Sequence, residues 1–306
     1  MSAGSPPFTP DLQRLRRSFD RAGPGYDTAA VLHAEVRGIL LQRLDLTALE
    51  PRVVLDAGAG TAQASRALKR RYPRARVLAL DCSLGMLRAA RQPRFWGRRF
   101  DRVCADAHRL PFADAGVDLI LSNLMMPWCD PDVVFAEFRR VLAPRGFLSF
   151  SSLGPDTLRE LRAAWARVDT CSRVVQLLDM HDLGDALVRA GFAAPVLDVE
   201  RYTLTYAELR GLMADLKAVG ARHGVVGGVG DVGGAGRPRG SSRGRWAALR
   251  AAYEAYRTDG RLPATCEVVF GQAWAPASAA PAAVRAEQPG VTLEQLTRTL
   301  PSRRGA

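Results

Sequence analysis

The 306-residue sequence has no apolar run close to the roughly 18 residues that a membrane-spanning helix needs. Its basic N-terminus is not followed by an apolar stretch, so we expect no secretory signal. The five cysteines are far apart and form no Cys-x-x-Cys pair, which argues against both a disulfide framework and a structural zinc site. We therefore predict a cytoplasmic protein that has no metal and no membrane span.

Lysine is almost absent as well, at Lys69 and Lys217 only, although Lys and Arg together number 43 against 31 Asp and Glu. The resulting net charge of +12 is therefore carried almost entirely by arginine. Such a surface can attract nucleic acid, an anionic membrane or an acidic protein. A genome rich in G and C would give the same composition, so charge alone selects no function.

Strand-like and helix-like segments alternate between residues 52 and 152. Strands are predicted at 52–57, 76–81, 102–105, 117–123 and 146–151, with helices such as 83–91 and 131–142 among them. Strands separated by helices pair in parallel through right-handed crossovers. The sequence thus predicts an α/β fold with a doubly wound, mostly parallel sheet, whose core at 52–152 would bind a cofactor.

The flanking segments are mainly helical. A lead-in at 12–46 is broken by the Gly-Pro-Gly loop at 23–27, and it would form a lid. Residues 153–276 would form the substrate side, with helices predicted at 156–168, 182–190, 206–219 and 246–257 and strands at 196–204 and 264–274. Asp182 is the expected N-cap of its helix and Gly191 the residue beyond its end. A single domain over 12–276 is predicted, with disorder at 1–11 and 277–306 and a mobile Gly/Arg-rich loop at 223–245.

The segment VVLDAGAGTA at 53–62 is the most informative one. A buried strand leads to Asp56, and Gly58 and Gly60 then allow a tight turn and close approach to a ligand. Asp81 ends the next strand, 81 − 56 = 25 residues later, close to the roughly 20 expected for a carboxylate that binds a ribose diol. This pattern predicts a ligand containing adenosine.

The same loop favours one kind of adenosine over another. A dinucleotide site needs a third glycine beside the pyrophosphate, and Ala62 stands there instead. The carboxylate of Asp56 would repel a phosphate, whereas it could hold an ammonium group directly or through water. S-adenosylmethionine therefore fits better than a nicotinamide cofactor.

On these motifs, residues 12–204 and 264–274 resemble the class I S-adenosylmethionine-dependent methyltransferases. The resemblance implies a seven-stranded sheet whose last strand, 264–274, runs antiparallel. It also implies that Asp81 binds the ribose, that Asn123 lies beside the methyl group, and that Asp56, Gly58 and Gly60 form the methionine-binding loop. Cys82 and Met86 would flank the adenine, and Asp106 with Ala107 would meet its amino group.

Longer segments resemble a narrower family, the malonyl-acyl-carrier-protein O-methyltransferases of the biotin pathway. They are RSFDRAGPGYDTAA, SSLGPDTLRELRAAW at 151–165, DMHDLGDALVRAGF at 179–192 and LPATCEVVFGQAWAP at 262–276. The resemblance implies methyl transfer to the free carboxylate of malonyl-acyl carrier protein, giving the methyl ester that primes pimeloyl synthesis; malonyl-CoA stays open as a substrate. Ala59 and Ala62 depart from the DAGCGTG loop usual in that family.

The implied substrate needs no general base, because a carboxylate with a pKa near 4 is ionised at pH 7. The protein has to align the reacting atoms and exclude water. Candidates for positioning the substrate are Tyr26, Asn123, Thr157, Arg159, His181 and Arg201, each of which could instead have a purely structural role. Met125, Met126 and Trp128 would belong to the core or to the pocket wall.

The arginines of the lead-in helix, Arg14, Arg16, Arg17 and Arg21, could meet an acidic carrier protein. Other readings remain open. GPDTLRELR, DLGDALVRAGF and LPATCEVV also resemble respiratory complex I assembly factors that hydroxylate a protein arginine. An RNA methyltransferase is disfavoured, since 223–245 contains no aromatic residue to stack on bases and SNLMMPW replaces the NPPY-type tetrapeptide. A non-catalytic cofactor-binding scaffold is a further alternative.

Overall fold

A computed structural model describes residues 12–22, 25–90, 99–168, 177–220 and 242–277. The predicted disordered N-terminus at 1–11, nearly all of the predicted tail at 277–306 and most of the predicted loop at 223–245 lie outside these ranges.

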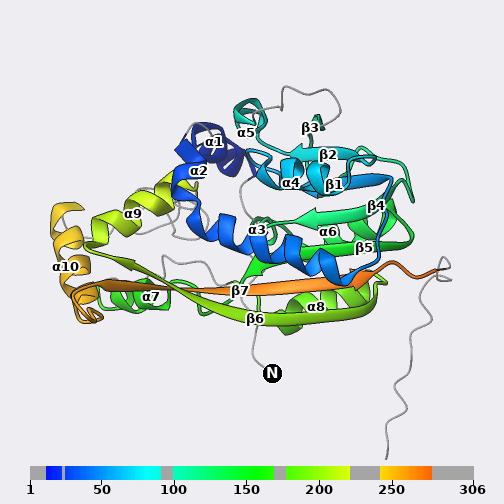
Figure 1. Cartoon of the computed structure of the whole chain (residues 1–306). Helices are drawn as coiled ribbons and strands as arrows, with labels where there is room; N and C mark the ends of the chain where they lie inside the picture. The colour runs from blue at the N-terminus through cyan, green and yellow to red at the C-terminus, as the bar shows by residue number, and fades with distance from the viewer. Residues whose placement is uncertain (1–11, 23–24, 91–98, 169–176, 221–241, 278–306) are drawn as a thin grey trace, which may run out of the picture.

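Seven strands form one sheet in the order β3-β2-β1-β4-β5-β7-β6 (Figure 1). They are β1 Val53–Ala57, β2 Arg76–Asp81, β3 Asp101–Cys104, β4 Val117–Ser122, β5 Leu142–Leu153, β6 Ala193–Tyr206 and β7 Leu262–Trp274. β1 to β5 pair in parallel, and β7 lies between β5 and β6 and runs antiparallel to both. The predicted mostly parallel sheet with an antiparallel last strand is confirmed.

Helices cover both faces of the sheet because each has one apolar stripe to bury. On one face, α3 (Val31–Arg43) and α4 (Gln63–Arg71) place Val36, Leu40 and Leu68 against β1 and β4. On the other, α6 (Pro131–Val141) and α8 (Met180–Arg189) bury a second apolar cluster that includes Phe135, Phe138, Leu183 and Leu187. The sheet is therefore doubly wound, as predicted.

The two longest strands extend beyond the parallel core and carry a third cluster. β6 has 14 residues and β7 has 13, against 5 in β1. Around their outer ends pack α7 (Arg159–Ala166), α9 (Leu209–Ala218) and α10 (Ser242–Glu254), at the left of Figure 1. α10 begins at Ser242, so residues 242–245 are helical rather than part of the predicted loop, because Leu249 and Tyr253 bury against this cluster.

The lead-in is helical, as predicted, on both sides of the predicted loop at 23–27. Of that loop, residues 23–24 lie outside the described ranges, and Tyr26 and Asp27 are helical instead. The lead-in consists of α1 (Leu12–Ala22), the short α2 (Tyr26–Ala29), α3 and the 3₁₀ turn η2 (Leu44–Leu46). α1 packs on α5 (Leu84–Ala89), where one carboxylate oxygen of Asp20 accepts hydrogen bonds from the Ser83 hydroxyl at 2.6 Å and the Gly85 N–H at 2.8 Å. A second 3₁₀ turn, η4 (Met126–Trp128), follows β4.

Some predicted boundaries are wrong for identifiable reasons. The N-cap of α8 is Asp179 rather than Asp182, since Asp179 accepts the N–H groups of His181 and Asp182 at 2.7 and 2.9 Å. Gly191 does follow the helix end, with φ +82°. α9 begins three residues later than predicted because β6 continues to Tyr206. None of the helices within the described ranges has the length and apolar character needed to cross a bilayer.

Gly271→Ala is expected to lower the free energy of unfolding by about 2 kcal/mol, because overpacking forces buried groups apart. Gly271 lies in β7 opposite Phe150 of β5, and a Cβ atom there would come within 2.3 Å of the buried Phe150 ring. Gly184→Ala is the matched control, since its Cβ would lie 3.5 Å from Leu197, an ordinary contact, inside α8 where alanine favours helix. Chemical denaturation should separate the two; equal stability would contradict the packing.

Candidate active site

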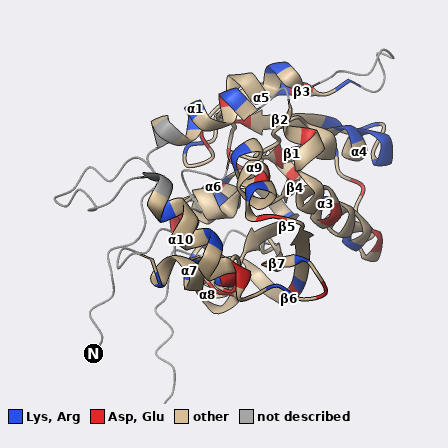
Figure 2. Cartoon of the chain, turned by 90° about the vertical axis from the view of Figure 1, so that its left-hand side faces the viewer, with Lys and Arg blue, Asp and Glu red and all other residues tan. Residues whose placement is uncertain are grey.

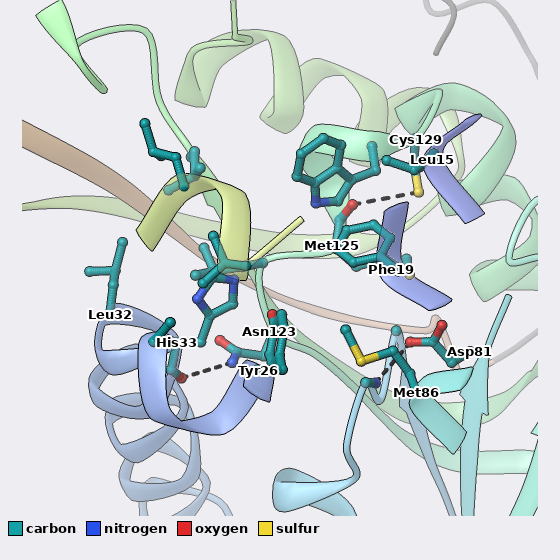
Figure 3. A pocket seen from close by; sticks show the side chains of 18 of the residues that line it. Leu15, Phe19, Tyr26, Leu32, His33, Asp81, Met86, Asn123, Met125 and Cys129 are labelled. Atoms are coloured by element: carbon teal, nitrogen blue, oxygen red, sulfur yellow. Dashed lines mark hydrogen bonds between the residues drawn. The ribbon is translucent and has the colours of Figure 1, made fainter. Parts of the chain in front are cut away.

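The carboxyl ends of β1, β2 and β4 open into a cavity that is covered by the lead-in helices (Figure 3). Ligands of open α/β sheets bind at this edge. From the covering side come Leu15 and Phe19 of α1, Tyr26 of α2 and His33 of α3. The site thus joins segments that are far apart in the sequence.

The glycine loop after β1 is held against β2 by its backbone. The N–H groups of Gly58 and Ala59 both donate to the Leu80 carbonyl, at 2.9 and 2.8 Å. Gly58 has φ +72°, and a Cβ there would lie 2.7 Å from the Met125 side chain, so this position requires glycine. Ala62 has φ +58°, a left-handed conformation that is strained for alanine. The departure from the family loop at Ala62 is therefore accommodated at a cost in backbone strain.

Asp81 ends β2 and faces the cavity (Figure 3). One carboxylate oxygen accepts the N–H of Gly60 and the other that of Ser83, both at 2.8 Å. Burial raises the pKa of Asp81, against the effect of these two bonds. Asp81 is thus a partly buried carboxylate that joins the loops after β1 and β2, and its ribose-binding role stays a prediction.

Asp56 lies in a second pocket on the other side of the glycine loop. Burial raises the pKa of this carboxyl to about 6, although the Ser65 hydroxyl donates a hydrogen bond to it. Arg37 of α3 and Asp27 of α2 line the same pocket. Charges of both signs at one end of the site, with Asp56 buried, Arg37 half-buried and Asp27 exposed, suit an amino-acid group, with its ammonium and its carboxylate, better than a phosphate.

The predicted adenine side is also assembled. Cys82, Met86, Asp106 and Ala107 all line the main cavity. One Asp106 oxygen accepts the His108 N–H at 2.9 Å and lies 2.7 Å from His108 Nδ1, while His108 Nε2 accepts the Asp130 N–H at 3.0 Å. Because Nε2 is an acceptor, Nδ1 carries the proton and donates to Asp106. This series of hydrogen bonds orients the Asp106 side chain at the cavity wall.

Three polar side chains line both pockets: Tyr26, His33 and Asn123. The Asn123 amide donates to the His33 carbonyl at 3.0 Å and accepts from the Ser151 hydroxyl at 3.1 Å (Figure 3). The rings of Tyr26 and His33 meet edge to face at 5.5 Å between centroids. Burial raises the pKa of Tyr26 and lowers that of His33 to about 4, so both are neutral hydrogen-bond donors at pH 7.

The other predicted substrate-positioning residues are placed differently. Thr157 lines the cavity, but its hydroxyl donates to the Glu267 carbonyl at 3.1 Å and accepts the Glu267 N–H at 3.2 Å, so it ties α7 to β7. The side chain of Arg159 is 57% exposed and lies beside Glu160. Arg201 bonds Asp156 and Glu267, each at 3.2 Å, and lines neither pocket. The structure therefore does not bring these two arginines to either pocket.

His181 was also expected near the ligand, and the structure places it outside both pockets. It is the second residue of α8, and its side chain is 79% exposed. α8 packs on α6 and on β6, so the residue lies away from the two pockets. Its backbone N–H donates a hydrogen bond to the carboxylate of Asp179, the N-cap of α8.

Away from the glycine loop, the cavity becomes mainly apolar. Leu204 of β6, Leu212 and Leu216 of α9, Val219 just beyond α9 and Trp128 of η4 line it there, together with the polar residues Tyr206 and Asp215. The lining also includes Met125, whereas Met126 is buried in the core. No Lys or Arg lines this cavity in the part of the chain that the structure describes.

Sequence reasoning missed His33 and Arg37. The signal was present, since the two residues are four apart on α3 and so project from one helix face, next to the buried stripe of Val36 and Leu40. Only the fold shows that this face covers the glycine loop. Within the described ranges, no group of three or more His, Cys, Asp or Glu side chains suits a metal ion.

Comparisons with known proteins agree with this arrangement. Residues 55–150 match the model of a methyltransferase domain. The chain is 52% identical over 274 residues to the malonyl-[acyl-carrier protein] O-methyltransferase of Methylovorus sp., covering 87% of this chain and 90% of that one. It is 49% identical over 281 residues to the enzyme of the same name from Laribacter hongkongensis, covering 89% and 92%.

Solved structures share the fold at low identity. A Bacillus halodurans protein assigned as a methyltransferase superposes with a TM-score of 0.52 at 17% identity, over 78% of this chain and 99% of that one. Phosphoethanolamine N-methyltransferase 2 of Haemonchus contortus gives 0.51 at 15% identity, over 86% and 60%. At these identities the likeness concerns the fold alone.

Proposed function

Because the chain belongs to the malonyl-[acyl-carrier protein] O-methyltransferase family, we propose that it transfers a methyl group from S-adenosylmethionine to the free carboxylate of malonyl-acyl carrier protein. The observation that carries this proposal is the 52% identity over 87% of the chain. We further propose that the reaction takes place in the cytoplasm and that the carrier-bound thioester is preferred to malonyl-CoA.

The residues of the site fit S-adenosylmethionine. Asp81 would hold the ribose hydroxyls, with Met86 and Asp106 on the adenine side. Asp56 would receive the ammonium and Arg37 the carboxylate of the methionine part, both from the second pocket. When bound, S-adenosylmethionine supplies an activated methyl carbon on a positively charged sulfur.

The acceptor carboxylate meets uncharged donors. It would lie near Tyr26, His33 and Asn123, where the two pockets meet. One hydrogen bond to the oxygen that does not react would orient the carboxylate and leave the other oxygen free to attack. A cation beside the acceptor would oppose the loss of negative charge as the ester forms. Among the described residues no Lys or Arg lines the main cavity, and Arg37 of the second pocket would be paired with the carboxylate of the methionine part. Neutral donors therefore suit this reaction better than the arginines that the sequence suggested.

The apolar walls of the main cavity would exclude water from the reacting atoms. Phe19 of α1 lies edge to face on Trp128 at 5.5 Å between centroids, closing the cavity opposite the glycine loop. Exclusion of water strengthens the hydrogen bonds inside and prevents wasteful hydrolysis. No proton has to be removed, so no general base is assigned.

Affinity for S-adenosylmethionine is expected to fall as the pH drops below about 6, where Asp56 becomes protonated. The ammonium favours the ionised carboxylate, so each pH unit below the pKa costs up to about tenfold in affinity. For folding the sign is opposite: a raised pKa means that ionised Asp56 opposes folding at neutral pH, and this cost fades as the pH falls through 6. Calorimetric titration from pH 5 to 8 measures the binding effect.

The variant Ser65→Ala distinguishes the titration of Asp56 from that of Asp81, the other acid of the site. Removing the hydroxyl that bonds Asp56 should raise the pKa of Asp56 further and move the midpoint of the binding profile to higher pH. Ser65 has no contact with Asp81, whose pKa is also raised. A midpoint that does not move would contradict the assignment of Asp56.

Mass spectrometry tests the proposed reaction. Incubation of the protein with S-adenosylmethionine and malonyl-acyl carrier protein should add one methyl group to the malonyl unit, as an ester that mild base removes. Malonyl-CoA in a parallel reaction compares the two thioesters. Unmodified carrier, with cofactor binding intact, would refute the proposed acceptor.

A further inference from the structure

A surface pocket, here called the basic notch, lies where α1 approaches α9. It is lined by Ser18, Arg21, Ala22, Gly25, Ala214, Lys217 and Ala218. Residues 18, 21 and 22 lie one helical turn apart on α1, and 214, 217 and 218 do the same on α9. Each helix thus brings one cation and small neighbours to the same place.

The basic notch adjoins the main cavity across a thin wall. Phe19, next to Ser18 in α1, and Val219, next to Ala218, line the main cavity. In this wall the Ser18 hydroxyl of α1 donates a hydrogen bond to the Gly220 carbonyl, just beyond α9, at 3.2 Å. Gly220 permits the contact, since a Cβ there would come within 2.8 Å of the Phe19 ring. A narrow chain passing between α1 and α9 would therefore link the basic notch to the apolar part of the cavity.

No carboxylate lines the basic notch in the described part of the chain. The nearest acids in sequence face elsewhere: Asp20 bonds Ser83 and Gly85, and Asp215 lines the main cavity and bonds Tyr206. Lys69, the other lysine of this protein, is used internally, because its ammonium donates to the carbonyls of Pro73 and Ala75. Arg21 Nε donates to the Arg17 carbonyl of its own helix at 3.0 Å, and the side chains of Arg21 and Lys217 are both exposed. Their positive charges therefore face solvent in a pocket whose other lining side chains are small.

We propose that the basic notch binds the phosphodiester at the head of the pantetheine arm on which acyl carrier protein presents the malonyl thioester. This proposal rests on the proposed function. The uncharged arm would pass between α1 and α9 into the apolar part of the cavity, and the carboxylate would reach Tyr26 and His33 at the far end. The phosphodiester, costly to bury, stays at the surface, where two cations meet it.

Charge on the face that carries the basic notch supports this orientation. Figure 2 views that side, with basic positions of α1 and α9 in blue. The exposed Arg16 and Arg17 continue the positive surface along α1. An acidic carrier protein would be steered toward this face. The basic notch would then fix the position of the pantetheine arm, and the rest of the positive surface would speed the encounter with the carrier protein.

The test uses the double variant Arg21→Gln/Lys217→Gln and three acceptors: malonyl-acyl carrier protein, malonyl-CoA and malonyl-pantetheine, which lacks phosphate. We expect KM for the carrier substrate to rise about tenfold or more, from the loss of charge-assisted bonds, and KM for malonyl-pantetheine to stay within twofold. Affinity for S-adenosylmethionine should not change. The effect on malonyl-CoA shows whether its phosphates reach the same cations.

The control is Arg70→Gln/Arg74→Gln, which removes the same charge from exposed positions at the far end of α4. An equal rise in KM with this control would show general steering and overturn the proposal. So would an equal rise on malonyl-pantetheine, or a rise on the carrier with no change on malonyl-CoA, which would indicate contact with the carrier's own surface. Failure of the wild-type protein to methylate any of the three acceptors would instead reject the proposed function.

Discussion

Asp81→Asn is expected to weaken the binding of S-adenosylmethionine by about 10²-fold or more. Hydrogen bonds to a charged group are worth about 1.5–3 kcal/mol each, and a ribose diol would make two of them with Asp81. The amide keeps the shape of the side chain, but it loses the charge and one acceptor. The expected loss is therefore greater than that of any single apolar contact in the cavity.

Stability should suffer much less than binding. Burial raises the pKa of Asp81, which means that the ionised carboxylate itself is unfavourable in the folded protein. The amide oxygen can still accept one of the two backbone N–H groups, from Gly60 or Ser83. Calorimetric titration and thermal unfolding together separate the two effects.

Asp101→Asn is the matched control, because Asp101 is an exposed carboxylate at the start of β3 that pairs with Arg76 at 2.7 Å. It should bind the cofactor as the wild type does. Should Asp81→Asn behave in the same way, the ribose-binding assignment would have to be abandoned.

Tyr26→Phe is expected to lower kcat by up to about 10²-fold while cofactor affinity changes little. The phenol is a neutral donor at all physiological pH values, because burial raises its pKa. Loss of the donor would leave the malonyl carboxylate free to rotate, and small misplacements of reacting atoms cost rates of this size. The ring remains, so its edge-to-face contact with His33 is kept.

Steady-state kinetics with malonyl-acyl carrier protein measures this effect, and calorimetry checks the cofactor. Tyr202→Phe is the control, since Tyr202 lies on β6 and bonds Glu200 at 2.7 Å, outside both pockets. If Tyr26→Phe changed only the affinity for S-adenosylmethionine, the hydroxyl would belong to the cofactor site, and His33 and Asn123 would be the remaining donors to the carboxylate.

The cofactor half of the site could be predicted from the sequence because its residues lie in neighbouring segments of the chain. A strand, a glycine turn and a helix follow one another in the chain, and Asp81 lies at the end of the next strand, so parallel pairing alone places Asp56, Gly58, Gly60 and Asp81 together. Their spacing carries the prediction, and the structure places all four in the two pockets. Their roles toward a ligand stay predictions.

The acceptor half was less accessible because its residues come from distant segments. Arg159, His181 and Arg201 have chemistry that suits a carboxylate, but helix phase and strand register direct them to solvent or to acidic partners. His33 and Arg37 carry no recognisable motif, and only the packing of α3 over the glycine loop brings them to the site. Such decisions depend on long-range contacts that no local pattern encodes.

By itself, the sequence determined the alternation of strands and helices, the doubly wound sheet, the glycine loop with its two acids and the resemblance to a methyltransferase family. Those features follow from hydrophobic periodicity and short spacings along the chain. Only the tertiary structure decided that α1, α2, α3 and α9 converge on one apolar cavity, that uncharged donors face its inner end, and that Arg21 and Lys217 meet outside it. Burial and charge at those places arise from segments nearly 200 residues apart, which come together because the sheet edge leaves an apolar surface to be covered.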